Sequence, residues 1–493
     1  MSTATLAQPS APRPRTVALL AGAALVLVPV AVALPLRLML LTPVAAGLVA
    51  LAYARPAWAA YLLLGVTPLT AGIARGTYVP VLRPHEALGL LLGSGVALRA
   101  LASLRAGYRI RPRMTGVDWA ILAMAATSSV LPLLWMAARG LAPTTEDLFY
   151  ASTIWKFYGL FVLVRTCVRT DRQVRRCLQV TLAAYAVVAV ITMLQSLQLA
   201  GVPELVDMIY ATDDPLGPAV GRGTATLGSS IAVGDVMAVC LAICLVWLRE
   251  RGHRVVLGGL AVLFAFGGLA SGQFSGLFAL GVVVFAVAAV TGHVRRLLAA
   301  MVPTALLGAL VMRPVVEKRL ESFDISTGLP HSWIVRFDNL RWFVWPEVFS
   351  GENWLFGVRP SSHIRVDTSW GPYIYIESGH LWLLWTGGIP FLVAFGAFTW
   401  VAVRTTASVA RTRSGPVGVA ATAALADLLA VFVLMAFDPH LTMRGTADLL
   451  FALLGMVIAT ARPATGDRHA VDSSTPPVAL VRAGPRAAAR ADR

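Results

Sequence analysis

The chain has little charge, almost no lysine and few cysteines. Only 13% of its 493 residues are charged, 57% are hydrophobic, and the mean hydropathy is +0.73. A soluble fold of this length needs more polar surface, so the composition excludes a soluble enzyme and predicts an all-α polytopic membrane protein. The four cysteines lie in or beside expected spans and form no Cys-x-x-Cys pair. This placement argues against both a disulfide framework and a thiolate metal site.

Apolar segments follow one another along nearly the whole chain. Crossing about 30 Å of hydrocarbon takes about 20 residues in a helix, and fourteen segments approach that length. The first three are short and closely spaced, so we expect 12–14 transmembrane helices. The segments are 17–35, 37–54, 57–75, 85–104, 117–137, 147–168, 178–200, 228–248, 255–272, 275–291, 296–312, 379–403, 416–437 and 444–461.

These segments divide the chain into five parts. Residues 1–16 form a cytoplasmic N-terminal segment, 17–312 hold the first eleven spans, 313–378 form one large loop, and 379–461 hold the last three spans. Residues 462–493 are rich in Ala, Pro and Arg, and this composition predicts a disordered cytoplasmic tail.

Positive charge is distributed unevenly between the two sides of the predicted membrane. The formal net charge is +16, which in a soluble protein would suggest nucleic acid as a partner. With both termini in the cytoplasm, however, most arginines fall in the inside segments and the C-terminal tail, which is the positive-inside pattern. The basic excess therefore indicates topology and not nucleic-acid binding. It places the loop 313–378 on the extracytoplasmic side of the cytoplasmic (inner) membrane.

The loop 313–378 is the longest segment that cannot span a membrane. Its acidic and basic residues are nearly balanced in number, and it holds five of the thirteen Trp. Aromatic rings interleaved with carboxylates and guanidiniums suit sugars, whose apolar C–H faces are ringed by hydroxyls; the same rings also suit a belt at the membrane interface. Arg336 and Leu340 stand four residues apart, which predicts an ordered loop with an amphipathic helix around residues 336–349.

Two basic residues lie where charge is unusual. Lysine occurs only twice in the chain, and Lys156 falls inside an expected span. A lysine there faces a cavity, binds a partner or snorkels to the interface. Arg222 lies where the chain re-enters the membrane, beside Gly221 and Gly223, which let the backbone approach a ligand closely. Its planar fork of donors suits an anionic head group, although a cation that anchors a span at the interface would occupy the same position.

Glu377 and His380 lie where the long loop ends and the next expected span begins. They are three residues apart at the mouth of a predicted helix, so we expect them on one helical face near the outer membrane surface. Either side chain is a candidate general base. Alternatively, Glu377 is a solvated carboxylate or an arginine partner, and His380 packs within a helix that also carries Trp382 and Trp385.

Three short motifs surround the long loop in a fixed order. One opens a span in the middle of the chain, one lies within the loop, and one closes it. They are Arg222-Gly-Thr followed by Leu-Gly-Ser-Ser at 227–230, a helix led by Arg336 and followed by Trp-Leu-Phe-Gly-Val at 354–358, and Glu-Ser-Gly-His-Leu at 377–381 followed by Gly-Gly-Ile-Pro at 387–390.

This combination, which covers roughly residues 156–390, resembles the O-antigen ligase and O-antigen polymerase family of membrane glycosyltransferases (WaaL-like and Wzy-like proteins). The resemblance implies inverting transfer of a glycan from an undecaprenyl-diphosphate-linked donor to a glycan acceptor, with no nucleotide donor, cofactor or required metal. A leaving diphosphate accumulates negative charge, which positive side chains stabilise. Arg222, Arg336, Arg341 and Lys156 are therefore the candidate residues for the donor diphosphate.

Glu377 is the first choice for the base that takes the proton of the acceptor hydroxyl, and His380 is the second. Two departures from the family pattern bear on these roles. Ligases of the family commonly have His-Asn where this chain has Glu377-Ser378, and often have Ser-Arg-Gly where it has Ser-Gly-Gln at 271–273. The first departure favours a polymerase over a ligase, and the second removes one expected arginine.

A transporter or flippase of a lipid-linked glycan or a small molecule is the alternative from another class. Such proteins typically have paired half-repeats, broken helices and ionisable residues at the membrane midplane. Near their midpoints the expected spans carry few charges, at Lys156, Asp235 and Asp427, and no half-to-half repeat is evident. A polyprenyl-phosphate-sugar transferase of the usual type would carry acidic residues in its first outer loop, where this chain has only Arg37.

Overall fold

The computed structural model describes residues 36–107, 114–211, 221–249, 254–292, 294–321, 323, 328, 331–368 and 371–460. The expected N-terminal segment 1–16, the first expected span 17–35 and the tail 462–493 lie outside the described residues. The helices described below belong to one compact unit that ends at Thr460.

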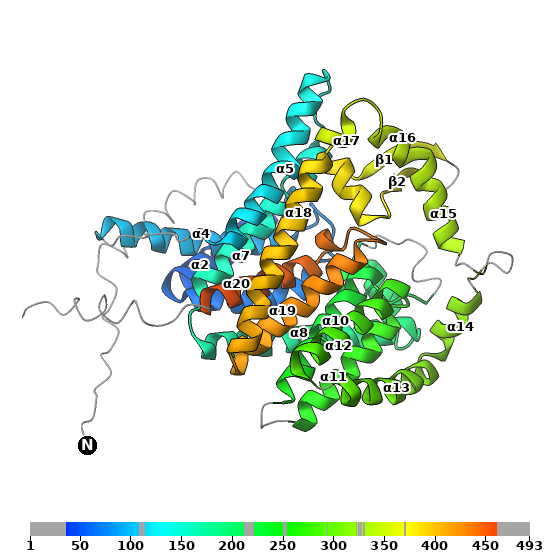
Figure 1. Ribbon diagram of the computed structural model, residues 1–493. Helices are drawn as coiled ribbons and strands as arrows, with labels where there is room; N and C mark the ends of the chain where they lie inside the picture. The colour runs from blue at the N-terminus through cyan, green and yellow to red at the C-terminus, as the bar shows by residue number, and fades with distance from the viewer. Residues whose placement is uncertain are drawn as a thin grey trace, which may run out of the picture. The chain divides into compact units, whose positions relative to one another are not determined.

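Each of the thirteen expected spans within the described residues coincides with one helix or with two consecutive helices. Eight helical stretches there are long and apolar enough to cross a membrane, and four shorter apolar helices accompany them. The chain is therefore an all-α polytopic membrane protein (Figure 1). The matching helices are α2 (Leu36–Ala54), α3 (Pro56–Thr70), α4 (Pro84–Arg105), α5 (Gly116–Ala138), α6 (Thr145–Ala151), α7 (Thr153–Cys167), α8 (Asp171–Ser196), α10 (Ser230–Trp247), α11 (Arg254–Ala270), α12 (Phe274–Thr291), α13 (Val294–Val311), α18 (Gly379–Thr412), α19 (Gly415–Leu434) and α20 (Thr446–Thr460).

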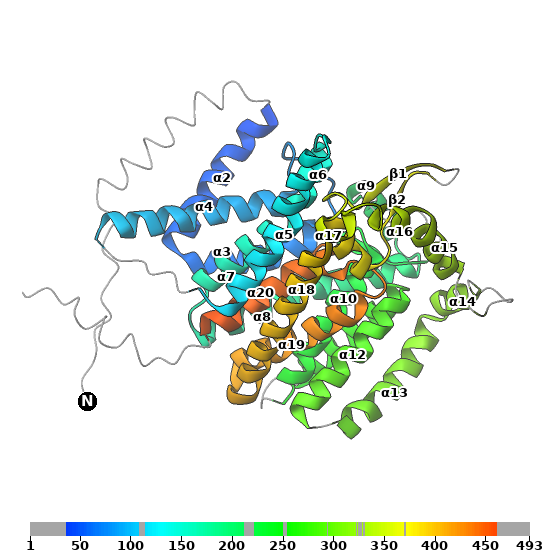
Figure 2. The ribbon, with the colours of Figure 1, turned by 45° about the horizontal axis from the view of Figure 1, so that its top comes forward.

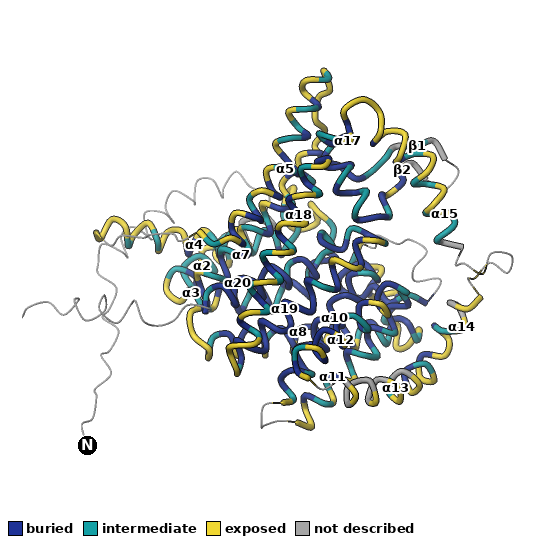
Figure 3. Tube along the Cα trace, viewed as in Figure 1, coloured by how far each residue is buried: buried dark blue, intermediate teal, exposed yellow. Residues whose placement is uncertain are grey.

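Among the eight long apolar stretches, α10 and α19 are the most deeply buried, each with 83% of its apolar stretch buried. Helix α12 packs against both, and the three lie side by side in Figures 1 and 2. Helix α19 is rich in alanine, and small side chains let helix backbones approach closely where lipid removes the hydrophobic drive for association. Figure 3 shows buried residues concentrated along these helices, whereas α13 exposes Leu306 and Leu310.

The loop between α13 and α18 contains several short helices. An unbroken helical run from His331 to Val348 confirms the helix predicted around residues 336–349, although it begins earlier. Its middle part is a π-helical turn, a feature that often occurs at functional sites. The helical elements of the loop are α14 (Arg313–Glu321), α15 (His331–Asn339), η3 (Leu340–Val344), α16 (Trp345–Val348) and α17 (Asn353–Phe356).

The loop ends in a β-hairpin that the sequence reading did not predict. Strand β1 (His363–Thr368) pairs antiparallel with β2 (Gly371–Tyr375). Residues 373–376 read Tyr-Ile-Tyr-Ile, which is the period-two pattern of a strand with one buried face. Both isoleucines are buried and both tyrosines are exposed. The pattern was therefore readable from the sequence, but it is too short to stand out within a loop.

Two of the three motifs pack against each other. Helix α18 is broken at Gly388, where φ is +63°, and a Cβ there would overlap the carbonyl oxygen of Leu355 in α17. Next to this contact, the N–H of Val358 donates to the carbonyl oxygen of Trp385 at 2.6 Å. The Trp-Leu-Phe-Gly-Val and Gly-Gly-Ile-Pro motifs thus form one joint that ties the loop to the break in α18.

Replacing Gly388 with alanine is expected to destabilise the protein by about 2–4 kcal/mol, because the new methyl group meets backbone and the left-handed conformation strains any other residue. Gly396→Ala is the matched control, since it lies in the same helix and nothing lies within 4 Å of a Cβ there. Alanine is the better helix former, so the control should be neutral or slightly stabilising. Thermal unfolding in detergent compares them; a Gly388→Ala midpoint equal to that of the wild type would contradict this account.

Candidate functional site

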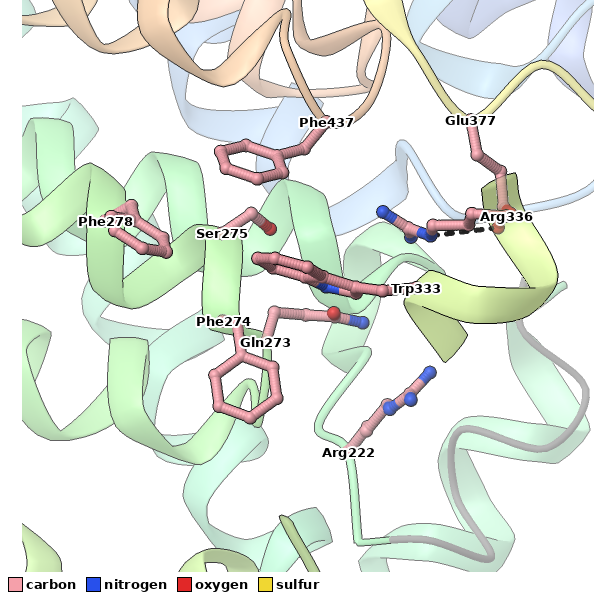
Figure 4. A pocket seen from close by; sticks show the side chains of 9 residues that line it. All are labelled: Arg222, Gln273, Phe274, Ser275, Phe278, Trp333, Arg336, Glu377 and Phe437. Atoms are coloured by element: carbon pink, nitrogen blue, oxygen red, sulfur yellow. Dashed lines mark ion pairs between the residues drawn. The ribbon is translucent and has the colours of Figure 1, made fainter. Parts of the chain in front are cut away.

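One pocket lies where the loop meets the helices, at the helix ends expected to face outward. It has a volume of about 100 Å³. Its walls come from segments far apart in the sequence: the approach to α10, the start of α12, helix α15, the chain before α18 and the chain after α19 (Figure 4). The lining residues are Arg222, Gln273, Phe274, Ser275, Phe278, Trp333, Arg336, Glu377 and Phe437.

Arg222 projects from an anchored stretch that precedes α10. The side-chain oxygen of Gln195 accepts a hydrogen bond from the N–H of Thr224 at 2.9 Å. A Cβ on Gly223 would overlap the side chain of Thr192 in α8, so only glycine fits there. The close approach that this glycine makes in the structure is to α8. A ligand contact at the backbone beside Arg222 stays a prediction.

Helix α15 presents Trp333 and Arg336 to the pocket. The two residues are three apart and therefore share a helical face, and Figure 4 shows both side chains directed to the pocket. The ring of Trp333 lies 5.6 Å from that of Phe437, and Phe437 stacks on Phe278 at 5.6 Å. An aromatic wall thus forms one side of the pocket, and the Arg336 guanidinium lies at another.

Arg336 makes two ion pairs at the edge of the pocket. Its Nη1 lies 3.0 Å from Oδ2 of Asp438, and its Nε lies 3.5 Å from Oε1 of Glu377. The side chain of Asp438 is 6% exposed, whereas that of Glu377 is 32% exposed. The buried carboxylate fixes the guanidinium through a charge-assisted hydrogen bond. The Glu377 carboxylate keeps an accessible surface toward the pocket.

A buried histidine–aspartate pair supports Asp438. Nδ1 of His440 lies 2.7 Å from Oδ2 of Asp235, and their side chains are 0% and 4% exposed. The backbone N–H of His440 donates to the carbonyl oxygen of Asp438 at 2.7 Å. Because Asp235 belongs to α10, the pair ties the turn after α19 to α10 and holds Asp438 beside Arg336. Ionisable groups buried in a membrane protein are costly and are usually retained for function.

The structure separates the two candidate bases. Glu377 lines the pocket, whereas the N–H of His380 donates to the carbonyl oxygen of Met435 at 3.1 Å and its ring lies edge-on to Phe432 at 6.5 Å. The expectation of one shared helical face is wrong. Ser378 is the N-cap of α18 and has extended backbone angles, so Glu377 precedes the helix, where helical spacing does not apply.

Two further candidates lie elsewhere. Arg341 is exposed, and its guanidinium carbon lies 5.4 Å from the centre of the Trp342 ring. It follows Arg336 by five residues, a spacing that turns it to a different side of the helical run. Nζ of Lys156 lies 3.1 Å from Oε1 of Glu86, which neutralises it locally. Among the described lining residues, the pocket brings together Arg222 and Arg336 but neither Arg341 nor Lys156.

Several residues at the pocket had no role assigned from the sequence. Gln273 belongs to the Ser-Gly-Gln stretch at 271–273, where the family that the chain resembles often has Ser-Arg-Gly. Its Nε2 donates to Oγ of Ser230 at 2.7 Å. The departure from the family pattern therefore lies in the candidate site itself. Asp438 stands in an Asp-Pro-His turn directly after an expected span. The sequence could have indicated Asp438 as a candidate, because it is a carboxylate at the end of an expected span. Its pairing with Arg336, however, depends on tertiary structure.

The site combines two guanidiniums, a carboxylate and aromatic rings in one small cavity. Guanidiniums bind phosphate oxygens in a bidentate geometry, and a carboxylate can accept a proton from a hydroxyl group. Comparison with known proteins adds no relative: no family model, curated protein or solved structure matches the chain. The chemistry of the pocket is therefore the basis for assigning a function.

Proposed function

We propose that this protein is a membrane glycosyltransferase that moves a glycan from a polyprenyl-diphosphate donor to an acceptor hydroxyl at the outer face of the cytoplasmic membrane. The observation that carries the proposal is that Arg222 and Arg336, far apart in the sequence, line one pocket together with Glu377. Paired guanidiniums suit a diphosphate, whose charge grows as the glycosidic bond breaks. A carboxylate in the same pocket suits the proton transfer that the acceptor requires.

Each group then has a defined part in the reaction. Arg222 and Arg336 bind the diphosphate of undecaprenyl diphosphate, and Asp438 keeps Arg336 oriented. The acceptor oxygen attacks the anomeric carbon from the side opposite the diphosphate, which leaves with the bonding electrons, so the configuration inverts. Glu377 takes the acceptor proton. When the donor is bound, its phosphate competes with Glu377 for the Arg336 guanidinium, which leaves the carboxylate available as a base.

A polymerase fits this site better than a ligase. The position that is commonly histidine in the ligases is Glu377 here, and a polymerase joins two molecules of the same lipid-linked glycan. Donor and acceptor are then both carried to the pocket by the membrane. The aromatic wall of Trp333, Phe437 and Phe278 offers an apolar surface for the donor next to the diphosphate.

Arg222→Ala is expected to lower turnover about 10²–10³-fold, which is the usual effect of removing one preorganised electrostatic group. Arg222→Lys should recover only part of the rate, because a point charge does not reproduce the two-pronged contact. The measurement uses purified protein in proteoliposomes with an undecaprenyl-diphosphate-linked repeat unit, and mass spectrometry detects the lengthened glycan and the released undecaprenyl diphosphate. Arg105→Ala, at an exposed position in the last turn of α4, is the control and should leave the rate unchanged.

A transporter or flippase is the second candidate, and two observations favour it. Helix α18 is broken at Gly387 and Gly388, and the core buries Asp235, Asp427 and His440. Broken helices and buried ionisable groups are typical of secondary transporters. The same proteoliposomes distinguish the two functions. Passage of a labelled donor across the bilayer with no change in glycan length would support transport and contradict transfer.

A further inference from the structure

Accessible and buried residues alternate from Tyr373 in β2 to Glu377, two residues beyond the end of the strand. Tyr373 and Tyr375 are 41% and 50% exposed, and Glu377 is partly exposed, whereas the residue that follows each of them is buried. Side chains of an extended chain alternate between two faces, so residues two apart share a face at a spacing of about 6–7 Å. The two tyrosines therefore lead along one face to the carboxylate of the pocket.

His363 completes this face from the neighbouring strand. It lies opposite Tyr375 in the hairpin, and its ring centre is 4.6 Å from that of Tyr375 and 5.8 Å from that of Tyr373. Its Nε2 lies 3.1 Å from the hydroxyl oxygen of Tyr150 in α6, and its Nδ1 pairs with Glu146. We call this group of three residues, Tyr373, Tyr375 and His363, the tyrosine platform.

A fully buried carboxylate fixes the platform to α6. Asp147, with a side chain 0% exposed, pairs with Nη2 of Arg359 at 2.6 Å and accepts a hydrogen bond from the N–H of Ser361 at 3.2 Å. The hydrogen bond to Asp147 raises the pKa of Arg359 above its ordinary value. Nε1 of Trp385 in α18 donates to the carbonyl oxygen of Ser361 at 2.8 Å. The platform is thus preorganised, and a ligand would bind it without ordering a loop.

We propose that the tyrosine platform is a saccharide-binding subsite that receives the acceptor glycan and directs its hydroxyl to Glu377. This proposal rests on the glycosyltransferase function proposed above. Aromatic rings cover the apolar C–H faces of sugars, while phenol and carboxylate groups beside them hydrogen-bond the hydroxyls; both ring nitrogens of His363 are held by Tyr150 and Glu146, so this ring contributes a fixed surface. Tyrosines also occur at membrane interfaces. Here, however, Tyr373 and Tyr375 occupy alternate positions in the segment that leads to the proposed base, and both rings lie beside His363, which is paired with Glu146.

The kinetic test replaces one ring at a time. Tyr375→Ala is expected to raise the apparent KM for the lipid-linked repeat unit, which serves as donor and acceptor, about three- to tenfold with little change in kcat, an effect of the size that a lost aromatic contact produces. Tyr375→Phe keeps the ring and should behave nearly as the wild type, whereas Tyr375→Leu keeps only apolar bulk and should resemble the alanine variant. Tyr78→Ala is the matched control, because Tyr78 is 58% exposed in the outer loop between α3 and α4.

A binding measurement gives a readout independent of turnover. The probe is the repeat-unit oligosaccharide released from the lipid donor by mild acid and then radiolabelled. Equilibrium dialysis against the detergent-purified protein should show affinity weakened about three- to tenfold by Tyr375→Ala and unchanged by Tyr78→Ala.

The outcomes separate this proposal from the proposed function. If the wild type lengthens the glycan and Tyr375→Ala keeps the wild-type KM and affinity, the subsite is overturned while the transferase function stands. If Tyr375→Leu performs as well as tyrosine while alanine fails, the residue serves an apolar contact such as the lipid interface, which also overturns the subsite. If no glycan is lengthened but the oligosaccharide binds in a Tyr375-dependent way, the transferase function fails and the saccharide site is supported.

Discussion

Arg336→Ala is expected to reduce glycan transfer by at least about 10²–10³-fold, because it removes a cation that would stabilise the leaving diphosphate. The same change leaves the carboxylate of Asp438, 6% exposed, without its ion-pair partner. An uncompensated buried charge costs about 3–5 kcal/mol, so stability should fall as well. Initial rates in proteoliposomes and thermal midpoints in detergent measure the two effects separately.

Two further variants test whether the lost glycan transfer comes from the missing cation and not from lower stability. In the double variant Arg336→Ala with Asp438→Asn the buried charge is gone, so stability should recover while transfer stays low. Arg341→Ala is the matched control, since Arg341 lies in the same helical run but is exposed outside the pocket. An equal loss of transfer in Arg341→Ala and Arg336→Ala would mean that the pocket is not the reaction site.

Glu377→Gln is expected to lose about 10²–10⁴-fold in turnover, the usual contribution of positioned proton transfer. The amide keeps the size and shape of the carboxylate but does not accept the proton of the acceptor. Binding of the lipid-linked donor should persist, because the arginines of the pocket remain. Single-turnover rates and donor binding by filtration are the two measurements.

His380→Ala tests the competing assignment and should keep most of the turnover, because the ring of His380 packs near Phe432. Glu377→Ala with added formate addresses a second possibility, that Glu377 acts only by positioning Arg336. A small carboxylate that enters the vacated space should restore part of the rate if proton transfer is the role. A near-normal rate for Glu377→Gln beside an inactive His380→Ala would make His380 the base.

The sequence alone determined the class of the protein and, within the described residues, the positions of its apolar helices. Hydropathy succeeds because lipid offers no hydrogen bonds to the backbone, so each apolar stretch of sufficient length must satisfy its polar groups within its own helix. The span expected at 147–168 appears as α6 and α7, which meet at Ser152. The helix around Arg336 was also readable, since its pattern of polar and apolar residues is local.

Predictions from local sequence patterns failed where the result depended on the exact start of a helix or on a partner residue distant in the sequence. The shared face expected for Glu377 and His380 required the helix to include both, but its N-cap is Ser378. Lys156 was assigned to the donor, yet it pairs with Glu86 in another helix. Nothing in the residues next to Lys156 contains this information, because the pairing arises from the packing of α4 beside α7.

The candidate site itself was decided by tertiary structure. The sequence supplied Arg222, Arg336 and Glu377 as separate motifs, and the packing of α12, α15 and the turn after α19 brings them to one pocket. Asp438 gained its role only there, through a 3.0 Å contact with Arg336. The physical reason is that hydropathy and helix periodicity describe short stretches of chain, whereas a binding site depends on which surfaces of distant helices bury each other.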